Sequence, residues 1–411
     1  MKENGEETTV SRWCLVSMAS IPLVMTLGNS MLIPVLPIFE RKVGITSFQS
    51  SLIITSYSIA SIFLIPVAGY LSDRLGRKKI ILPSLILALI GGLIAGYASW
   101  KLENPFTWII IGRILQGVGA SGAAPIILPL VGDLYKDDDE KTSSCLGIIE
   151  TSNTFGKVLS PILGSVFAAF LWFLPFFSIS IFSLVSILLV FFFIKVPKDE
   201  EEEPQKIKEF LKKTKKLFKK EGKWLYTVFL LGCFAMLILF AVLFFLSDIL
   251  EKLHDLKGIK KGFVLAIPLF FLCLSSFITG MKIKGNKKVM KMIVIVSLII
   301  MGVFILFVAQ NTENLVFLLG IVTMIGIAIG AMLPTLDALI TENIEKEERG
   351  TISSFYSSAR FIGVAAGPPL MSLAISDYLS ISFIGAAVVG AILIFMVMKL
   401  ISGSNKKTKQ A

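Results

Sequence analysis

Twelve apolar runs, each long enough to cross a lipid bilayer as a helix, constrain this chain more than any other feature. A hydrocarbon core about 30 Å thick requires about 20 apolar residues, because each residue adds about 1.5 Å of helical rise. Only 17% of the 411 residues are charged, which is too small a share for the surface of a water-soluble domain. We therefore predict an all-α membrane protein with twelve transmembrane helices. The predicted spans are residues 14–37, 47–69, 80–99, 106–131, 143–167, 173–194, 224–247, 262–280, 289–309, 315–338, 351–374 and 378–400.

One extended polar segment divides the twelve runs into two sets of six. Residues 195–223 hold an acidic block and then a basic stretch whose apolar residues recur at helical spacing, which is typical of an amphipathic helix on an anionic membrane surface. The expected domains are an N-terminal six-helix bundle at 1–194, a cytosolic linker at 195–223, a C-terminal six-helix bundle at 224–401 and a cytosolic tail at 402–411.

An internal repeat favours a duplicated six-helix unit. The fifth run contains "GKVLSPILGS" and the eleventh contains "GVAAGPPLMS", so that Gly156 and Gly363 begin equivalent stretches 207 residues apart. Small residues four positions apart let two helices approach closely, and the proline that follows weakens or kinks the helix. Either stretch alone is equally well explained by ordinary helix packing. Their matching positions in the two halves make duplication the better interpretation.

The basic residues avoid one side of the predicted membrane. With the N-terminus in the cytosol, only seven of the 40 Lys and Arg residues lie on the opposite side: Arg41, Lys42, Lys101, Lys252, Lys257, Lys260 and Lys261. The positive-inside rule therefore predicts a multi-pass protein of the cell (inner) membrane with both termini in the cytosol. This distribution explains the net charge of +11 better than a nucleic-acid-binding face does, so no nucleic-acid partner is expected.

The chain lacks the residues that several kinds of catalytic, metal-binding or nucleotide-binding site require. His254 is the only histidine and the four cysteines are scattered singly, so we expect neither a metal site nor a Ser-His-Asp hydrolase. No G-x-x-x-x-G-K-[ST] stretch is present to hold the phosphates of ATP. The prediction is a non-enzymatic protein without a cofactor, and any energy that it uses must come from an ion gradient.

The stretch "GYLSDRLGRKK", residues 69–79, joins the second and third runs and resembles the G-x-x-x-D-R-x-G-R-[RK] signature of the major facilitator superfamily. The matching residues are Gly69, Asp73, Arg74, Gly76, Arg77 and Lys78. The resemblance implies a cytosolic gate, in which Asp73 pairs with Arg77 or caps a facing helix end and latches the two halves together. It also implies that Asp133, at the end of the fourth run, pairs with Arg77. Positive-inside anchoring alone would explain the basic residues but neither the acid nor the glycines.

Three further stretches resemble the drug:proton antiporter branch of that superfamily, whose members have twelve spans. "LGNSMLIPVLP" in the first run resembles its first-helix pattern, and "GRILQGVGASGAA" in the fourth run resembles its R-x-x-Q-G pattern, which places Arg113 at the position associated with proton transfer. "GKVLSPILGS" resembles its antiporter motif, although serines replace two glycines. The residues carried over from that motif are Gly156, Ser160, Pro161 and Gly164. The loop "GMKIKGNKKVM" in the second half keeps lysines but lacks the acid and the arginines of the first-half signature.

Charged residues inside predicted spans are functional candidates, because burying a charge in hydrocarbon is costly. The candidates for proton coupling are Arg113, Glu150 and Asp337. Glu150 lies about two turns into the fifth helix, where burial favours the protonated acid, and we expect it to carry the proton, with Asp337 as the alternative carrier. A purely structural Glu150, paired with Arg113 or Lys157, is nearly as consistent with the sequence.

The resemblance implies a central cavity between the two bundles. The polar residues that it places there are Asn29, Tyr57, Asn153, Tyr356 and Arg360. The expected function is proton-coupled export of lipophilic or amphiphilic small molecules, with several unrelated drugs as substrates and no obligate protein partner. Alternatives are a dedicated exporter of an endogenous product such as a siderophore or a glycolipid, uptake by symport, and a membrane sensor or scaffold that does not transport.

Overall fold

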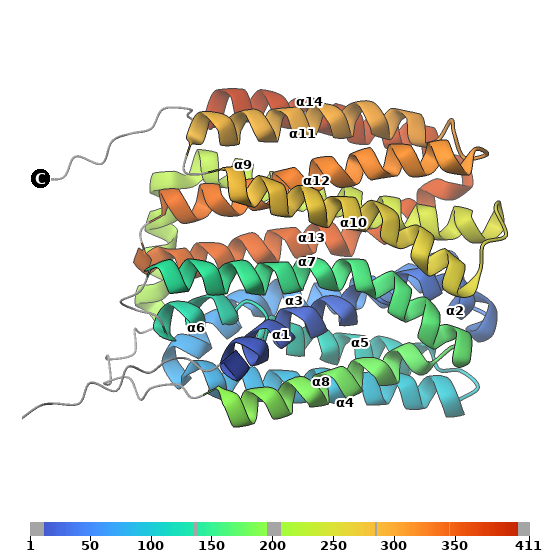
Figure 1. Ribbon diagram of the computed structural model, residues 1–411, viewed down its shortest axis with the longest axis horizontal. Coiled ribbons are helices and arrows are strands. Elements are labelled where there is room, and N and C mark those ends of the chain that lie inside the picture. The colour runs from blue at the N-terminus through green and yellow to red at the C-terminus, as the bar shows by residue number, and fades with distance from the viewer. Residues whose placement is uncertain (1–11, 135–138, 195–206, 284–285, 345, 402–411) are drawn as a thin grey trace, which may run out of the picture.

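The computed structural model describes residues 12–134, 139–194, 207–283, 286–344 and 346–401, and these residues form a bundle of helices that run roughly side by side (Figure 1). Ten helical spans within these residues are long and apolar enough to cross a membrane. The helices of the first half are α1 (Arg12–Ser30), η1 (Ile33–Val35), α2 (Leu36–Val43), α3 (Ser47–Leu75), α4 (Arg77–Lys101), α5 (Phe106–Ser121), α6 (Ile127–Leu134), α7 (Asp139–Phe170) and α8 (Leu174–Phe193). Those of the second half are α9 (Ile207–Lys252), α10 (Gly258–Lys282), α11 (Lys287–Val308), α12 (Leu315–Asn343), α13 (Lys346–Asp377) and α14 (Leu379–Leu400).

The first and fourth predicted spans are interrupted. In the first, α1 and α2 are joined through the short helix η1, which contains Pro34; a proline has no N–H to donate to the preceding turn. The fourth span was predicted as one run over 106–131, but the structure divides it between α5 and α6 at residues 122–126, which include Pro125. The division explains why this span is not among the ten long apolar ones. Helix α7, which carries polar and charged side chains, is not among them either.

The end of the predicted linker and the seventh predicted span form one continuous helix. The sequence placed a separate surface helix in the linker and the next bundle at residue 224, whereas α9 is a single helix of 46 residues from Ile207 to Lys252. Lys, Glu and Leu, which have high helix propensity, dominate its first turns, and no proline interrupts it. Residues 195–206 lie outside the described part of the chain.

Each half arranges its helices in the same way. In the first half, α1 packs against α7, α3 against α5, and α4 against both α5 and α8. In the second half the same partners recur, with α9 against α13, α10 against α12, and α11 against both α12 and α14. These equivalent pairings are those of a six-helix unit present twice.

Close backbone contacts at glycines hold the equivalent pairs together. A Cβ atom at Gly164 of α7 would collide with the carbonyl oxygen of Met31, and one at Gly363 of α13 would collide with that of Cys233 in α9. Without a side chain at these positions, the fifth helix of each half approaches the first helix of the same half closely.

Two further pairs, α3 with α13 and α7 with α10, join the halves across the middle of the bundle (Figure 1). We call the end of the bundle at the α3–α4 connection, around Gly76, the signature end. The opposite end, at the α2–α3 and α9–α10 connections around Gly44 and Gly258, is the far end. In Figure 1 the signature end is on the left and the far end on the right.

Candidate transport pathway

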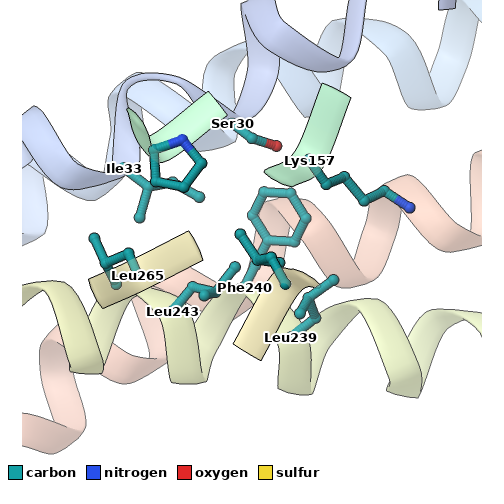
Figure 2. A pocket seen from close by; sticks show the side chains of 9 residues that line it. Ser30, Ile33, Lys157, Leu239, Phe240, Leu243 and Leu265 are labelled. Carbon is teal, nitrogen blue, oxygen red and sulfur yellow. The ribbon is translucent and has the colours of Figure 1, made fainter. Parts of the chain in front are cut away.

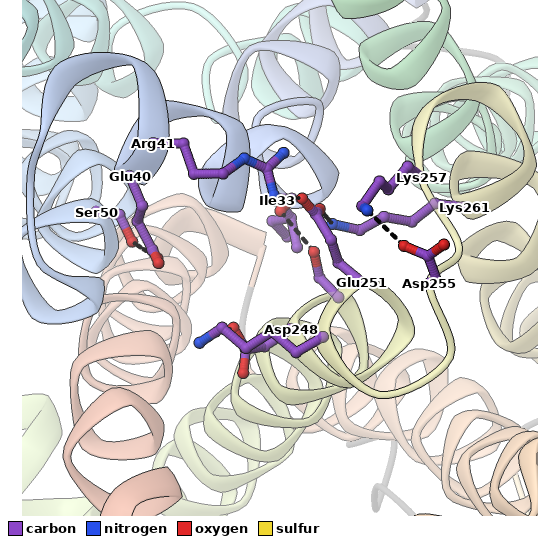
Figure 3. Close-up of polar contacts among 11 residues, drawn as sticks. Ile33, Glu40, Arg41, Ser50, Asp248, Glu251, Asp255, Lys257 and Lys261 are labelled. Carbon is purple, nitrogen blue, oxygen red and sulfur yellow. Dashed lines mark hydrogen bonds and ion pairs between the residues drawn. The ribbon is translucent and has the colours of Figure 1, made fainter.

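A buried ion-pair cluster joins the two halves at the far end (Figure 3). Arg41 of α2 pairs with Glu251 of α9, and Lys261 of α10 donates to the other oxygen of the same carboxylate at 2.8 Å. The side chains of Glu251 and Lys261 are only 3% and 1% exposed. The Glu251 carboxylate therefore contacts a cation from each half, which compensates much of the cost of burying it.

Other polar contacts at this end also cross between the halves. Ser247 Oγ donates to the carbonyl oxygen of Ile33 at 3.0 Å, and Thr55 Oγ1 donates to that of Ala365 at 2.7 Å. A Cβ at Gly262 of α10 would lie 2.5 Å from an α7 carbonyl oxygen, so these helices touch here as well. The far end of the structure is closed.

Further polar contacts at the far end stay within one half. Glu40 accepts a hydrogen bond from Ser50 Oγ at 2.6 Å, and Lys252 pairs with Asp248 at 2.7 Å within α9 (Figure 3). In the α9–α10 connection the Lys257 ammonium donates to Asp255 and lowers the pKa of that carboxyl group. These contacts stabilise the connections without joining the halves.

A pocket lies between the halves near the middle of the bundle (Figure 2). It is lined by Ser30, Ile33, Lys157, Pro161, Leu239, Phe240, Leu243, Leu265 and Leu269. The lining is apolar except for one hydroxyl and one ammonium group, which is the composition expected for a site that takes an organic molecule.

Four charged residues lie next to this pocket, towards the signature end. Lys157 and Glu150 come from α7, and Asp337 and Arg360 come from α12 and α13 of the other half. Arg360 Nη1 is 3.8 Å from Asp337 Oδ1, and the two side chains are 17% and 39% exposed. Both side chains are therefore partly accessible to solvent.

Some of the predicted cavity residues lie in this charged cluster, and the others lie in the packed interior around it. Asn153 Nδ2 donates to Glu150 Oε1 at 3.3 Å, and Arg360 stacks over the Tyr356 ring at 5.6 Å, so both belong to the charged cluster. Asn29 is 7% exposed, and Tyr57 is 2% exposed and donates to the carbonyl oxygen of Met25. Asn29 and Tyr57 are therefore part of the packed interior, and the Tyr57 ring also lies 6.4 Å from that of Phe361 in α13 of the other half.

Arg113 is a completely buried cation. Its guanidinium donates to the carbonyl oxygens of Ile53 and Gly28, both at 2.8 Å, and to Gln116 Oε1 at 2.6 Å. It also lies 4.6 Å above the ring centre of Tyr57. Within the described residues Arg113 forms no ion pair, so helix carbonyl groups, an amide and an aromatic face compensate its charge. The structure does not bring it into contact with Glu150.

The signature loop contains one of its predicted pairs. Asp73 forms an ion pair with Arg77, which also donates to Ser72 Oγ at 2.8 Å. Gly76 has φ of 98°, a conformation that favours glycine, and it ends α3 before α4 begins. Arg74 is exposed, and the side chain of Asp133 lies outside the described part of the structure.

Two residues of the signature contact other helices. A Cβ at Gly69 would lie 3.0 Å from Ser354 Oγ of α13, so the loop approaches the second half here. Lys78 instead donates to the carbonyl oxygens of Phe191 and Ile194 at 2.9 and 2.7 Å, and so caps the C-terminus of α8. In the second half Lys291 caps α14 in the same way, through Met398 and Ile401, both at 2.7 Å.

The antiporter-motif residues follow one side of α7. Gly156 faces α1 at Leu23, Ser160 Oγ donates to the Gly156 carbonyl oxygen at 2.7 Å, and Pro161 lines the pocket. Together with Gly164, they pack α7 against the first span and shape the pocket wall.

Sequence reasoning missed the far-end cluster and most of the pocket lining. Asp248 and Glu251 were the available signal for the cluster, since they are acids at the end of an otherwise apolar run. The sequence predicted Lys157 only as a partner for a structural Glu150 and did not assign it to the cavity. The apolar lining has no sequence signal, because a Leu or Phe that lines a pocket looks the same as one that faces lipid.

The sequence profile of the Major Facilitator Superfamily matches residues 18–368 and 291–411, which is most of the chain. The chain belongs to the Major Facilitator Superfamily. Membership in this superfamily identifies it as a multi-pass membrane transporter and not an enzyme, as the signature loop predicted.

Two relatives within the superfamily come from Bacillus subtilis (strain 168). The bacillibactin exporter is 51% identical over 396 residues, which cover 96% of this chain and 98% of the relative. Multidrug resistance protein 2 is 23% identical over 387 residues, which cover 90% and 89%.

Solved structures of the superfamily have the same fold. The D-xylose-proton symporter has a TM-score of 0.76 at 13% identity, and the alignment covers 96% of this chain and 98% of that one. The human organic anion transporter MFSD10 has a TM-score of 0.71 at 16% identity, with 94% and 99% covered. These similarities confirm the all-helical fold with about twelve spans that the sequence predicted.

Proposed function

We propose that this protein exports a siderophore. The observation that carries the proposal is the 51% identity to the bacillibactin exporter over almost the full length of both chains. The sequence resemblance alone favoured multidrug export, with a siderophore as the alternative. The multidrug relative is only 23% identical, so the order of the two readings is reversed.

The geometry is compatible with this function. The signature end faces the cytosol in our proposal, and the closed far end faces outwards. A substrate then enters the central pocket from the cytosol, next to Lys157 and the charged cluster. Export follows when the halves rock about the pocket, so that the contacts at the far end separate and those at the signature end close.

Protons supply the energy in this proposal. The carboxyl groups of Glu150 and Asp337 lie among the charges beside the pocket, and one of them binds a proton from outside and releases it to the cytosol. Glu150 is the preferred carrier, because it lies on the same helix as Lys157 and hydrogen-bonds to Asn153 instead of forming an ion pair within the described residues. Asp337, which is paired with Arg360, is the second candidate.

Proteoliposomes test the function and the carrier together. The purified protein is given iron-free bacillibactin, and proton movement and substrate movement are recorded for the wild type and for Glu150→Gln. We expect the wild type to couple the two movements, and the variant to bind the siderophore without moving protons. If Glu150→Gln still couples proton movement to substrate movement, we infer that Asp337 is the proton carrier.

Transport assays with a panel of lipophilic cations distinguish siderophore export from multidrug export and from a protein that does not transport. If several unrelated cations move and bacillibactin does not, multidrug export is correct. If no compound moves in either direction, the alternative of a sensor or scaffold gains support, and the same variants would then leave its signalling unchanged.

A further inference from the structure

Lys157 is a buried cation in the wall of the pocket. Its residue is only 8% exposed, and Figure 2 shows its side chain among those that line the pocket. Within the part of the chain that the structure describes, its ammonium group makes neither a hydrogen bond nor an ion pair. An unpaired buried charge is costly, so a group at this position should have a partner that arrives from outside the protein.

Charges of both signs surround Lys157: Glu150 and Asp337 attract its ammonium group, and Arg360 repels it. The two acids contact other residues. Asp337 of α12 forms an ion pair with Arg360 of α13 at 3.8 Å, and Glu150 accepts a hydrogen bond from Asn153. Within the described residues neither acid pairs with Lys157, so its ammonium group is available to an anionic ligand.

The other walls of the pocket suit an apolar or aromatic group. Leu239, Phe240 and Leu243 of α9 and Leu265 and Leu269 of α10 form a continuous apolar face. A ligand that satisfies the whole pocket carries an acidic group at one end and a hydrophobic body at the other.

We propose that Lys157 forms an anion subsite that selects organic acids, with the carboxylate or phenolate of the substrate at its ammonium group and its apolar body against α9 and α10. The proposal rests on the siderophore-export function and names the substrate chemistry that its pocket recognises. Because Lys157 belongs to the first half and α9 and α10 belong to the second, a bound organic acid contacts both halves.

The test uses purified full-length protein and two small probes of nearly equal shape. Salicylate carries a negative charge and salicylamide does not. We expect salicylate to bind the wild type about tenfold more tightly, as a charge-assisted hydrogen bond predicts, and to raise its melting temperature more than salicylamide does. Equal effects of the two probes would overturn the anion subsite.

Variants then assign the preference to Lys157. Lys157→Met keeps the length of the side chain and should abolish the difference between the probes, whereas Lys157→Arg should keep it. Lys157→Met should also raise the melting temperature of the ligand-free protein, because it removes an unpaired buried charge. If Lys157 only stabilised the fold, the same substitution would lower the melting temperature.

Lys101→Met, on an exposed lysine at the far end, is the matched control and should change neither the binding of the two probes nor the melting temperature. A Lys157→Met protein that still prefers salicylate refutes the assignment.

Bacillibactin transport is measured separately on the same preparations. If the wild type prefers salicylate but does not move bacillibactin, the proposed siderophore function fails and the anion subsite stands. If the wild type moves bacillibactin and Lys157→Met moves it equally well, the function stands and the subsite fails.

Discussion

Replacement of Arg41 by alanine should open the far end. Its guanidinium is 56% exposed, but the carboxylate that it pairs with, on Glu251, is 3% exposed. Lys261 continues to neutralise that carboxylate in the variant, so no buried charge is left unpaired. An exposed ion pair contributes about 0–1 kcal/mol, and a hydrogen bond to a charged group about 1.5–3 kcal/mol. With one partner exposed we expect about 1 kcal/mol, which is about a fivefold shift towards the state that is open at the far end.

Distance measurements between spin labels can detect this shift. Glu103 in the α4–α5 connection and Glu313 in the α11–α12 connection are exposed, and they lie at the far end of different halves. Cysteines at these two positions, after replacement of the four native cysteines, carry the labels in lipid nanodiscs. The population with the longer distance should increase about fivefold in Arg41→Ala.

Lys252→Ala is the matched control. Lys252 is also 56% exposed and pairs with a buried carboxylate, that of Asp248, which is 6% exposed. Both partners lie on α9, so the loss of this pair leaves the contact between the halves intact. The reasoning is refuted if Arg41→Ala has the distance distribution of the wild type, or if both variants shift it equally.

Two further variants test the packing of buried groups. Glu251→Gln should lower the melting temperature strongly, because it leaves Lys261, which is 1% exposed, without its charge partner at a cost of about 3–5 kcal/mol, and the added change Lys261→Met should restore most of the loss. Gly363→Ala should lower both the melting temperature and transport, since its Cβ would collide with the Cys233 carbonyl oxygen, whereas Gly302→Ala, which has open space around it, should be close to the wild type in both assays.

Hydropathy alone predicted the outline of the fold, because lipid requires long apolar helices whatever their neighbours are. The predicted run 378–400 corresponds to α14, Leu379–Leu400, and the near-continuous fifth and sixth runs are separated only at residues 171–173. The extent of α9 could not be read in this way. Whether a polar amphipathic stretch lies on the membrane or extends the next helix depends on contacts that are distant in sequence.

The candidate site was predictable where local sequence determines the contact. Asp73 and Arg77 are four residues apart, and their pair follows from the loop itself. The partners Arg41 and Glu251 come from opposite halves of the chain, so only the assembled bundle brings them together. Tyr57 shows the opposite case, because its polar group suggested the cavity while the fold buries it under Arg113.

The two capping lysines, Lys78 and Lys291, distinguish what belongs to the repeated unit from what belongs to the whole transporter. Each holds the end of the sixth helix of its own half, so this contact belongs to the repeated unit. The acid and the arginines of the signature loop occur in the first copy alone. Both copies thus preserve a contact that stabilises a single half, whereas the charged signature loop distinguishes the first half from the second.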